Sequence, residues 1–136
     1  MRSKFYREDM TLLHEGLSIS DAAAATGLST HTLRYYERAG LMLTPVDRAS
    51  STHRRYSTAD VTWVQFLTRL RSTGMPISTI RIYTELVRAG ESSVEDRLDL
   101  LLRHRTAVLA QLDEITASLA AIDYKIAVYR QKETHE

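Results

Sequence analysis

Two arginines, Arg34 and Arg38, are spaced one helical turn apart in a segment that also carries hydroxyl, imidazole and phenol groups. If the segment is helical, one face carries most of its polar groups, namely Ser29, Thr30, His31, Arg34, Tyr35 and Arg38. Guanidinium and hydroxyl groups bond to phosphates and to base edges in the DNA major groove. The face is therefore a candidate nucleic-acid-binding surface, and an ordinary solvated helix face is the alternative.

A second basic cluster follows this segment. It consists of Arg48 and the run Thr52-His53-Arg54-Arg55-Tyr56. Residues 1–90 contain 12 Lys and Arg against 8 Asp and Glu, whereas residues 91–136 contain 6 against 9. The two parts of the chain therefore have different partners, and a polyanion suits the first part. For the cluster itself, a merely solvated loop is the alternative.

The residues allow little other chemistry. The chain has 136 residues, 43% hydrophobic and 26% charged, as in one globular unit with an appendage. It contains no cysteine, which excludes disulfides, thiolate zinc sites and thiol redox sensing. The five histidines are scattered, and no phosphate loop or nucleophile-base arrangement occurs. We therefore expect no enzyme activity, no metal and no cofactor. Since no apolar run is long enough for a signal peptide or a membrane span, we expect a cytoplasmic protein without a membrane partner.

Two short helices joined by a tight turn must position the polar face. We predict that Ser20 caps a helix ending at Gly27, and that Ser29 caps a second helix over residues 30–39, ended by Gly40. This is the helix-turn-helix pattern, in which the second helix is presented to DNA. The inward side of that helix should comprise Leu28, Leu33, Tyr36 and Gly40.

The next segment contains a break in the helical pattern and then two further helices. For residues 41–56 we predict a two-stranded hairpin, or wing, that carries the second basic cluster. Ser57 and Asp60 have capping-box spacing at the start of a third helix. Its core face should be Val61, Val64, Leu67 and Leu70, widened by Trp63 and Phe66. We predict a fourth helix that Ser78 caps and Gly90 ends, with a buried stripe of Ile80, Tyr83, Leu86 and Val87.

The last part of the chain has a heptad pattern, because apolar residues repeat in steps of four and three without Gly or Pro. The seam comprises Val94, Leu98, Leu101, Val108, Leu112, Ile115, Leu119, Ile122, Ile126 and Tyr129, with Arg105 as its one charged position. A helix over residues 93–131 is about 58 Å long, more than a small domain can cover. We therefore predict a coiled-coil homodimer, with an internal helical hairpin as the alternative. Arg105 needs a partner carboxylate, and Asp113 and Glu114 are candidates.

Several of these residues together resemble the MerR family of transcription regulators over residues 17–90. They are Ile19-Ser20-Asp21-Ala22-Ala23, Thr26-Gly27-Leu28-Ser29, Thr32-Leu33-Arg34-Tyr35-Tyr36-Glu37-Arg38-Ala39-Gly40-Leu41 and Arg54-Arg55-Tyr56. The resemblance implies a winged helix-turn-helix head on an antiparallel coiled-coil dimer. It also implies binding to an inverted repeat in an overlong promoter spacer, which is undertwisted and bent so that RNA polymerase engages both promoter elements.

The resemblance also assigns roles and shows departures. It implies that Arg34, Tyr35 and Arg38 are recognition-helix contacts, and that Arg54, Arg55 and Tyr56 are wing contacts. The chain has Thr52-His53 where the family usually carries Gly before an aromatic. It also lacks the cysteines through which metal-sensing and redox-sensing branches respond. Because only seven residues follow Tyr129, we do not expect the large ligand domain of drug-sensing branches. Its tail is similar to the small aldehyde-stress or nitrosative-stress branch, and any small-molecule effector is unknown.

We therefore expect a mainly α chain with an extension over residues 1–17, a winged helix-turn-helix domain over 18–90 and a coiled-coil dimerisation helix over 91–136. The extension is an extra helix, a basic arm or the product of an upstream start codon. The expected function is regulation of transcription by a homodimer on an inverted-repeat operator. A DNA-architectural or recombination-accessory protein with the same head is the second hypothesis, and a coiled-coil adaptor with a protein partner is the third.

Overall fold

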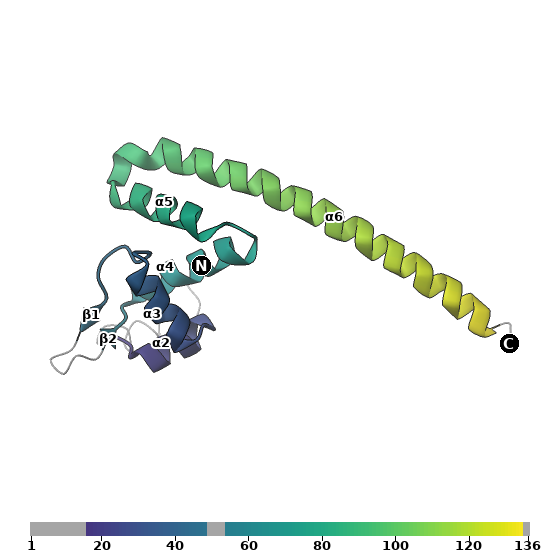
Figure 1. Cartoon of the computed structure of the whole chain (residues 1–136), viewed down its shortest axis with the longest axis horizontal. Helices are drawn as coiled ribbons and strands as arrows, with labels where there is room; N and C mark the ends of the chain where they lie inside the picture. The colour runs from purple at the N-terminus through teal and green to yellow at the C-terminus, as the bar shows by residue number, and fades with distance from the viewer. Residues whose placement is uncertain (1–15, 49–53, 135–136) are drawn as a thin grey trace, which may run out of the picture. The chain divides into compact units, whose positions relative to one another are not determined.

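The structure, a computed structural model, describes residues 16–48 and 54–134. In chain order its elements are α2 (Ile19–Thr26), α3 (Thr30–Arg38), β1 (Asp47–Arg48), β2 (Arg54–Arg55), α4 (Thr58–Ser72), α5 (Ile77–Arg88), the 3₁₀ helix η1 (Gly90–Ser93) and α6 (Val94–Thr134). Within the described residues, two helices precede one short hairpin, and three α-helices and the 3₁₀ helix follow it (Figure 1). This order confirms the predicted fold class. By its contacts the chain divides after Arg97 into two compact units.

The first described helix, α2, starts earlier than predicted. Ser18 has an extended backbone, and its Oγ accepts a hydrogen bond from the Asp21 amide at 3.2 Å. The prediction that Ser20 is the cap is wrong, because Ser20 already lies within the first turn. Both serines suit the role locally. Leu17, however, pairs with Tyr56 in an antiparallel bridge, which holds the chain extended up to Ser18.

A glycine turn joins α2 to α3. Gly27 has φ = 74°, a left-handed conformation that side chains disfavour, and its N–H closes the last turn of α2. Ser29 then caps α3 as predicted, its Oγ accepting from the Thr32 amide at 3.1 Å. Leu33 and Tyr36 are buried, as predicted for the inward side. The opposite face of α3 is therefore left for other contacts.

The third helix, α4, forms the centre of the first unit. The capping box is confirmed: the Asp60 amide donates to Ser57 Oγ at 3.1 Å, and the Ser57 amide donates to Asp60 Oδ2 at 2.9 Å. The predicted core residues Val61, Val64, Leu67 and Leu70 are all buried. Because α4 contacts both α2 and α5, this apolar face holds the helix-turn-helix against the rest of the unit.

The fourth helix, α5, differs from the prediction at its start and along its stripe. Its N-cap is Pro76, with no side-chain cap bond, so the predicted cap at Ser78 is wrong. Proline has no N–H to satisfy and its φ suits a helix start. The predicted stripe is only partly buried: Ile80 and Tyr83 are buried, whereas Leu86 and Val87 are half-buried. The buried position that the pattern missed is Thr84, whose hydroxyl donates to the Ile80 carbonyl at 2.8 Å.

The two capping assignments predict different effects of serine substitution. Ser57→Ala should lower the free energy of unfolding by about 1 kcal/mol, because it leaves a helix amide without its acceptor. The matched control Ser78→Ala should change it by well under that amount, since Ser78 is not a cap. Urea unfolding of both variants at one protein concentration measures the difference. Equal losses would contradict these assignments.

The last helix, α6, is unbroken over its 41 residues. Its first turn belongs to the first unit, and there Arg97 Nη2 donates to the Gly90 carbonyl at 3.0 Å. Just before it, Ser93 Oγ in η1 donates to the Leu86 and Gly90 carbonyls. From Leu98 onward the helix forms the second unit. None of the helices in the described part of the chain is both long and apolar enough to cross a membrane.

Candidate nucleic-acid interface

The outward face of α3 carries most of the polar side chains that the sequence singled out. His31, Arg34, Tyr35 and Arg38 are exposed, and Thr30 is half-buried. Ser29 is exposed, but its Oγ is occupied by the Thr32 amide and hydroxyl. The four exposed groups follow each other around one side of the helix because Leu33 and Tyr36 pack inward on the other. The fold thus brings the predicted recognition residues of α3 together.

The charge on this face is not neutralised from within the described chain. Among residues 16–48 and 54–134, the structure shows no ion pair or hydrogen bond of the Arg34 or Arg38 guanidinium. Each guanidinium therefore keeps its five N–H donors for a ligand, in the planar arrangement that matches phosphates and guanine edges. A surface with these properties favours a polyanion.

The hairpin carries the second basic cluster, as predicted. β1 and β2 pair antiparallel, with Asp47 opposite Arg55 and Arg48 opposite Arg54. Arg55 is exposed. The register therefore concentrates three arginines in a hairpin of two short strands. His53, the remaining basic candidate, lies outside the described residues.

Tyr56 is buried, whereas a DNA contact would be exposed. Its side chain is 1% exposed, and its hydroxyl donates to the Glu37 carboxylate on α3. Its backbone is paired with Leu17, N to O at 2.7 Å and O to N at 2.8 Å. Since the ring and the hydroxyl are used within the protein, we infer that Tyr56 positions the end of the hairpin against α3.

Neither of the other two buried tyrosines supplies a base or a nucleophile. Burial raises the pKa of Tyr36, and a hydrogen bond from Thr68 and the charge of Arg71 only partly offset it. Burial also raises the pKa of Tyr83, and the charge of Arg97 offsets part of this rise. Both phenols are therefore neutral at physiological pH. Within the described residues there is also no group of three or more His, Asp or Glu side chains that could hold a metal ion.

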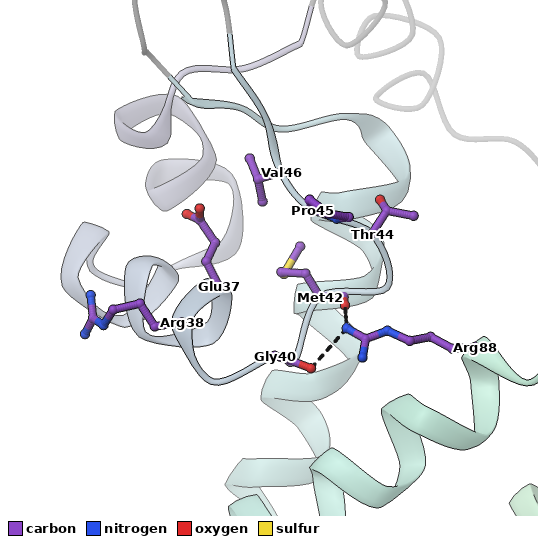
Figure 2. A pocket seen from close by; sticks show the side chains of 8 residues that line it. All are labelled: Glu37, Arg38, Gly40, Met42, Thr44, Pro45, Val46 and Arg88. Atoms are coloured by element: carbon purple, nitrogen blue, oxygen red, sulfur yellow. Dashed lines mark hydrogen bonds between the residues drawn. The ribbon is translucent and has the colours of Figure 1, made fainter.

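A pocket of about 410 Å³ opens beside the C-terminal end of α3. It is lined by Glu37, Arg38, Gly40, Met42, Thr44, Pro45, Val46 and Arg88. Figure 2 shows Arg88 reaching from α5 to the carbonyls of Gly40 and Met42, with Arg38 on the opposite side. No role was predicted for Glu37 or Arg88, because no local spacing signals a bond between segments so far apart in the chain.

The predicted seam residues form an open apolar stripe along α6. The most exposed are Leu98, Leu112, Ile115, Leu119, Ile122 and Tyr129, each more than half exposed, and Ile126 is 40% exposed. Leu101 and Val108 are half-buried, and Arg105 is exposed. The ion pair between Arg103 and Asp99 on α6 lies off the seam. A stripe of this length is far more apolar surface than single exposed residues explain.

Comparison with known proteins points to one family. The chain matches the family model described as "MerR HTH family regulatory protein" over residues 17–86 and the model "MerR, DNA binding" over residues 61–124. It is 34% identical over 110 residues to an uncharacterized HTH-type transcriptional regulator of Haemophilus influenzae, covering 81% of each chain. It is 37% identical over 93 residues to the HTH-type transcriptional regulator AdhR of Bacillus subtilis, covering 68% of this chain and 66% of AdhR.

A solved structure is similar along most of the chain. HiNmlR, a MerR family regulator that lacks the sensor domain, has been solved bound to promoter DNA. Its structure superposes with a TM-score of 0.79 at 31% identity, covering 88% of this chain and 94% of HiNmlR.

Proposed function

The chain belongs to the MerR family of helix-turn-helix regulators, and from this premise we propose that it binds an inverted-repeat operator as a homodimer and distorts the DNA between the half-sites. The chain is a DNA-binding transcriptional regulator, and the relatives that it matches are named as transcriptional regulators. The inverted-repeat operator, the homodimer and the distortion of the DNA are our proposal. The observation that carries it is the exposed, unneutralised arginine face of α3 within the matched segment.

Within this proposal the two basic clusters have different tasks. Arg34, Tyr35 and Arg38 enter the major groove, where a guanidinium can read guanine by two parallel hydrogen bonds. Arg48, Arg54 and Arg55 on the hairpin contact the backbone or an adjacent minor groove, and these contacts fix the register without reading sequence. Ser29, Thr30, His31 and His53 complete the proposed DNA-binding set.

A second copy of the chain is the proposed partner of the α6 stripe. Its seam comprises Leu98, Leu101, Arg105, Val108, Leu112, Ile115, Leu119, Ile122 and Ile126. The stripe continues over many turns of an unbroken helix and is open within the described chain. A regulator that binds an inverted repeat needs twofold symmetry, and a self-complementary stripe supplies it. Arg105 then pairs with a partner carboxylate and helps to set the register.

The effect of the bound dimer on transcription is proposed from the family resemblance. A dimer that undertwists and bends the spacer changes the promoter's fit to RNA polymerase, and an effector acts by shifting the populations of the two DNA shapes. Because the chain has no cysteine, an effector must be sensed without a thiol of the protein. Transcription in vitro from a promoter with an overlong spacer, with and without the protein, separates this function from a purely architectural one.

The test of DNA binding uses the full chain and DNA selected by it. A duplex enriched from randomised DNA should contain an inverted repeat, and its affinity should fall about a thousandfold between 50 and 200 mM salt if some six phosphates are neutralised. A duplex with scrambled half-sites is the control and should bind far more weakly. Fluorescence anisotropy measures both. Salt-independent binding, or enrichment of no sequence, would refute the proposal.

A further inference from the structure

The loop that joins α3 to the hairpin is held by an unusual set of hydrogen bonds. Over Ala39–Leu43, here called the junction, five successive carbonyls each accept from a side chain of α4 or α5. Arg81 Nε donates to Ala39 O at 3.2 Å, and Trp63 Nε1 donates to Leu41 O at 2.7 Å. Arg88 serves the other three: Nη2 donates to Gly40 O at 3.1 Å and to Met42 O, and Nε donates to Leu43 O at 3.2 Å.

The last turn of α3 satisfies its carbonyls locally, through the backbone amides of Ala39, Gly40 and Leu41. The junction carbonyls lie beyond that turn, where water or a local backbone amide is the usual donor. Here their donors come from residues 22 to 48 positions further along the chain. Beneath the bonds, Leu41 and Met42 are buried in the core at 0% and 4% exposure. The junction is therefore fixed on both sides, by core packing and by donors.

Arginine is the residue type that this arrangement requires at position 88. Its planar guanidinium presents five N–H donors in fixed directions, so one side chain can reach three carbonyls at once. Figure 2 shows two of these bonds, those to Gly40 and Met42. The Lys ammonium carries the same charge on a flexible stem without the planar fork. A Lys at position 88 therefore retains the positive charge and loses the three-carbonyl geometry.

The position of the junction matters because two DNA-contacting elements meet there. α3 ends at Arg38 and β1 begins at Asp47, so a shift of the junction moves the hairpin relative to the recognition helix. Base-edge hydrogen bonds tolerate such shifts poorly, whereas the attraction between arginines and phosphates falls off slowly with distance. Loss of the junction's hydrogen bonds should therefore affect the reading of sequence more than the attraction to DNA.

We propose that Arg88 is a positioning residue which, through the junction, fixes the hairpin relative to α3 and thereby determines the sequence specificity of DNA binding. This rests on the proposed function of α3 and the hairpin. Arg88 acts through the backbone carbonyls of Gly40, Met42 and Leu43 rather than through a base. It is also in the last turn of α5, which η1 connects to α6, so the same contact ties the DNA-binding elements to the base of the long helix.

The test compares Arg88→Lys with Arg71→Lys in the full chain. Arg71 also donates to a backbone carbonyl, that of Met75 at 3.3 Å, but the structure shows no hydrogen bond from it to a junction carbonyl. For each protein, anisotropy gives the ratio of affinities for the inverted-repeat duplex selected by the wild-type chain and for its scrambled counterpart. A variant that is only less stable loses active protein equally on both duplexes, so this ratio does not move. Arg88→Lys should lower the ratio about tenfold, and Arg71→Lys should leave it unchanged.

The outcomes separate the two proposals. If the wild-type chain discriminates the duplexes and Arg88→Lys does so equally well, the role of Arg88 is refuted while the proposed function stands. If the wild-type chain selects no duplex, the proposed function fails first. Should Arg88→Lys not fold, Arg81→Lys tests the same junction through Ala39 alone. A decrease of about threefold in its ratio would support the proposal, and an unchanged ratio would refute it.

Discussion

Replacing Ile115 by aspartate should convert the protein into a monomer and lower its affinity for the operator by more than about a hundredfold. Ile115 lies in the middle of the α6 stripe and is 65% exposed in the single chain, so the subunit itself has little reason to unfold. In the proposed dimer the substitution occurs twice and places two carboxylates in an apolar seam, where burial of an unpaired charge is costly. Sedimentation at micromolar concentration measures the mass, and anisotropy measures binding.

A matched control lies on the same helix. Ala117→Asp introduces the same charge two positions further along, off the seam, and should leave both the mass and the DNA affinity unchanged. The loss of operator binding in Ile115→Asp is expected because each half-site then binds independently, without the effective concentration that a linked second head provides. A dimeric Ile115→Asp, or a monomeric wild-type chain, would show that the stripe has another occupant.

Replacing Arg34 by alanine should lower the affinity for the selected operator at least about thirtyfold, since a lost base contact costs about 1–3 kcal/mol and occurs in both half-sites. It should also relax the preference at one base position of each half-site. Arg55→Ala should instead weaken binding to operator and scrambled duplexes alike and reduce the salt slope by about 1 for each copy. Binding titrations at several salt concentrations distinguish the two patterns.

Arg34→Lys separates charge from geometry in this experiment. It keeps the positive charge, so binding to scrambled DNA should be retained, but it cannot form the two parallel bonds of a guanidinium with guanine. Its discrimination between duplexes should therefore fall toward that of Arg34→Ala. If both Arg34 variants kept the specificity of the wild-type chain, α3 would not be the recognition helix.

Much of the secondary structure and of the interface could be predicted from short-range patterns. Ser29 and the pair Ser57 and Asp60 are caps. A hydroxyl or carboxylate can accept a hydrogen bond from an amide three residues away, and this contact does not depend on the rest of the fold. The stripe of α4 is buried as its spacing predicted. The exposed arginines of α3 likewise follow from helical periodicity, once the apolar side of the helix is known to pack inward.

The tertiary structure decided which residue caps a helix where two residues suit the role equally well. It also decided the contacts that no local sequence pattern predicts. Ser18 rather than Ser20 caps α2 because Leu17 pairs with Tyr56, a residue far along the chain. Tyr56 is of a residue type that suits a wing contact. The packing of the hairpin against α3 instead buries it, with its hydroxyl donating to Glu37.

Arg88 shows the same limit most clearly. In the sequence it is one of several arginines, with nothing in its neighbours that distinguishes it. Periodicity and capping describe interactions within a few residues, whereas the bonds of Arg88 to the junction exist only after α5 has packed beside the end of α3. The sequence alone thus determined which helices form and which faces are charged or apolar. Packing between distant segments decided which polar groups remain available for DNA and which hold the fold in place.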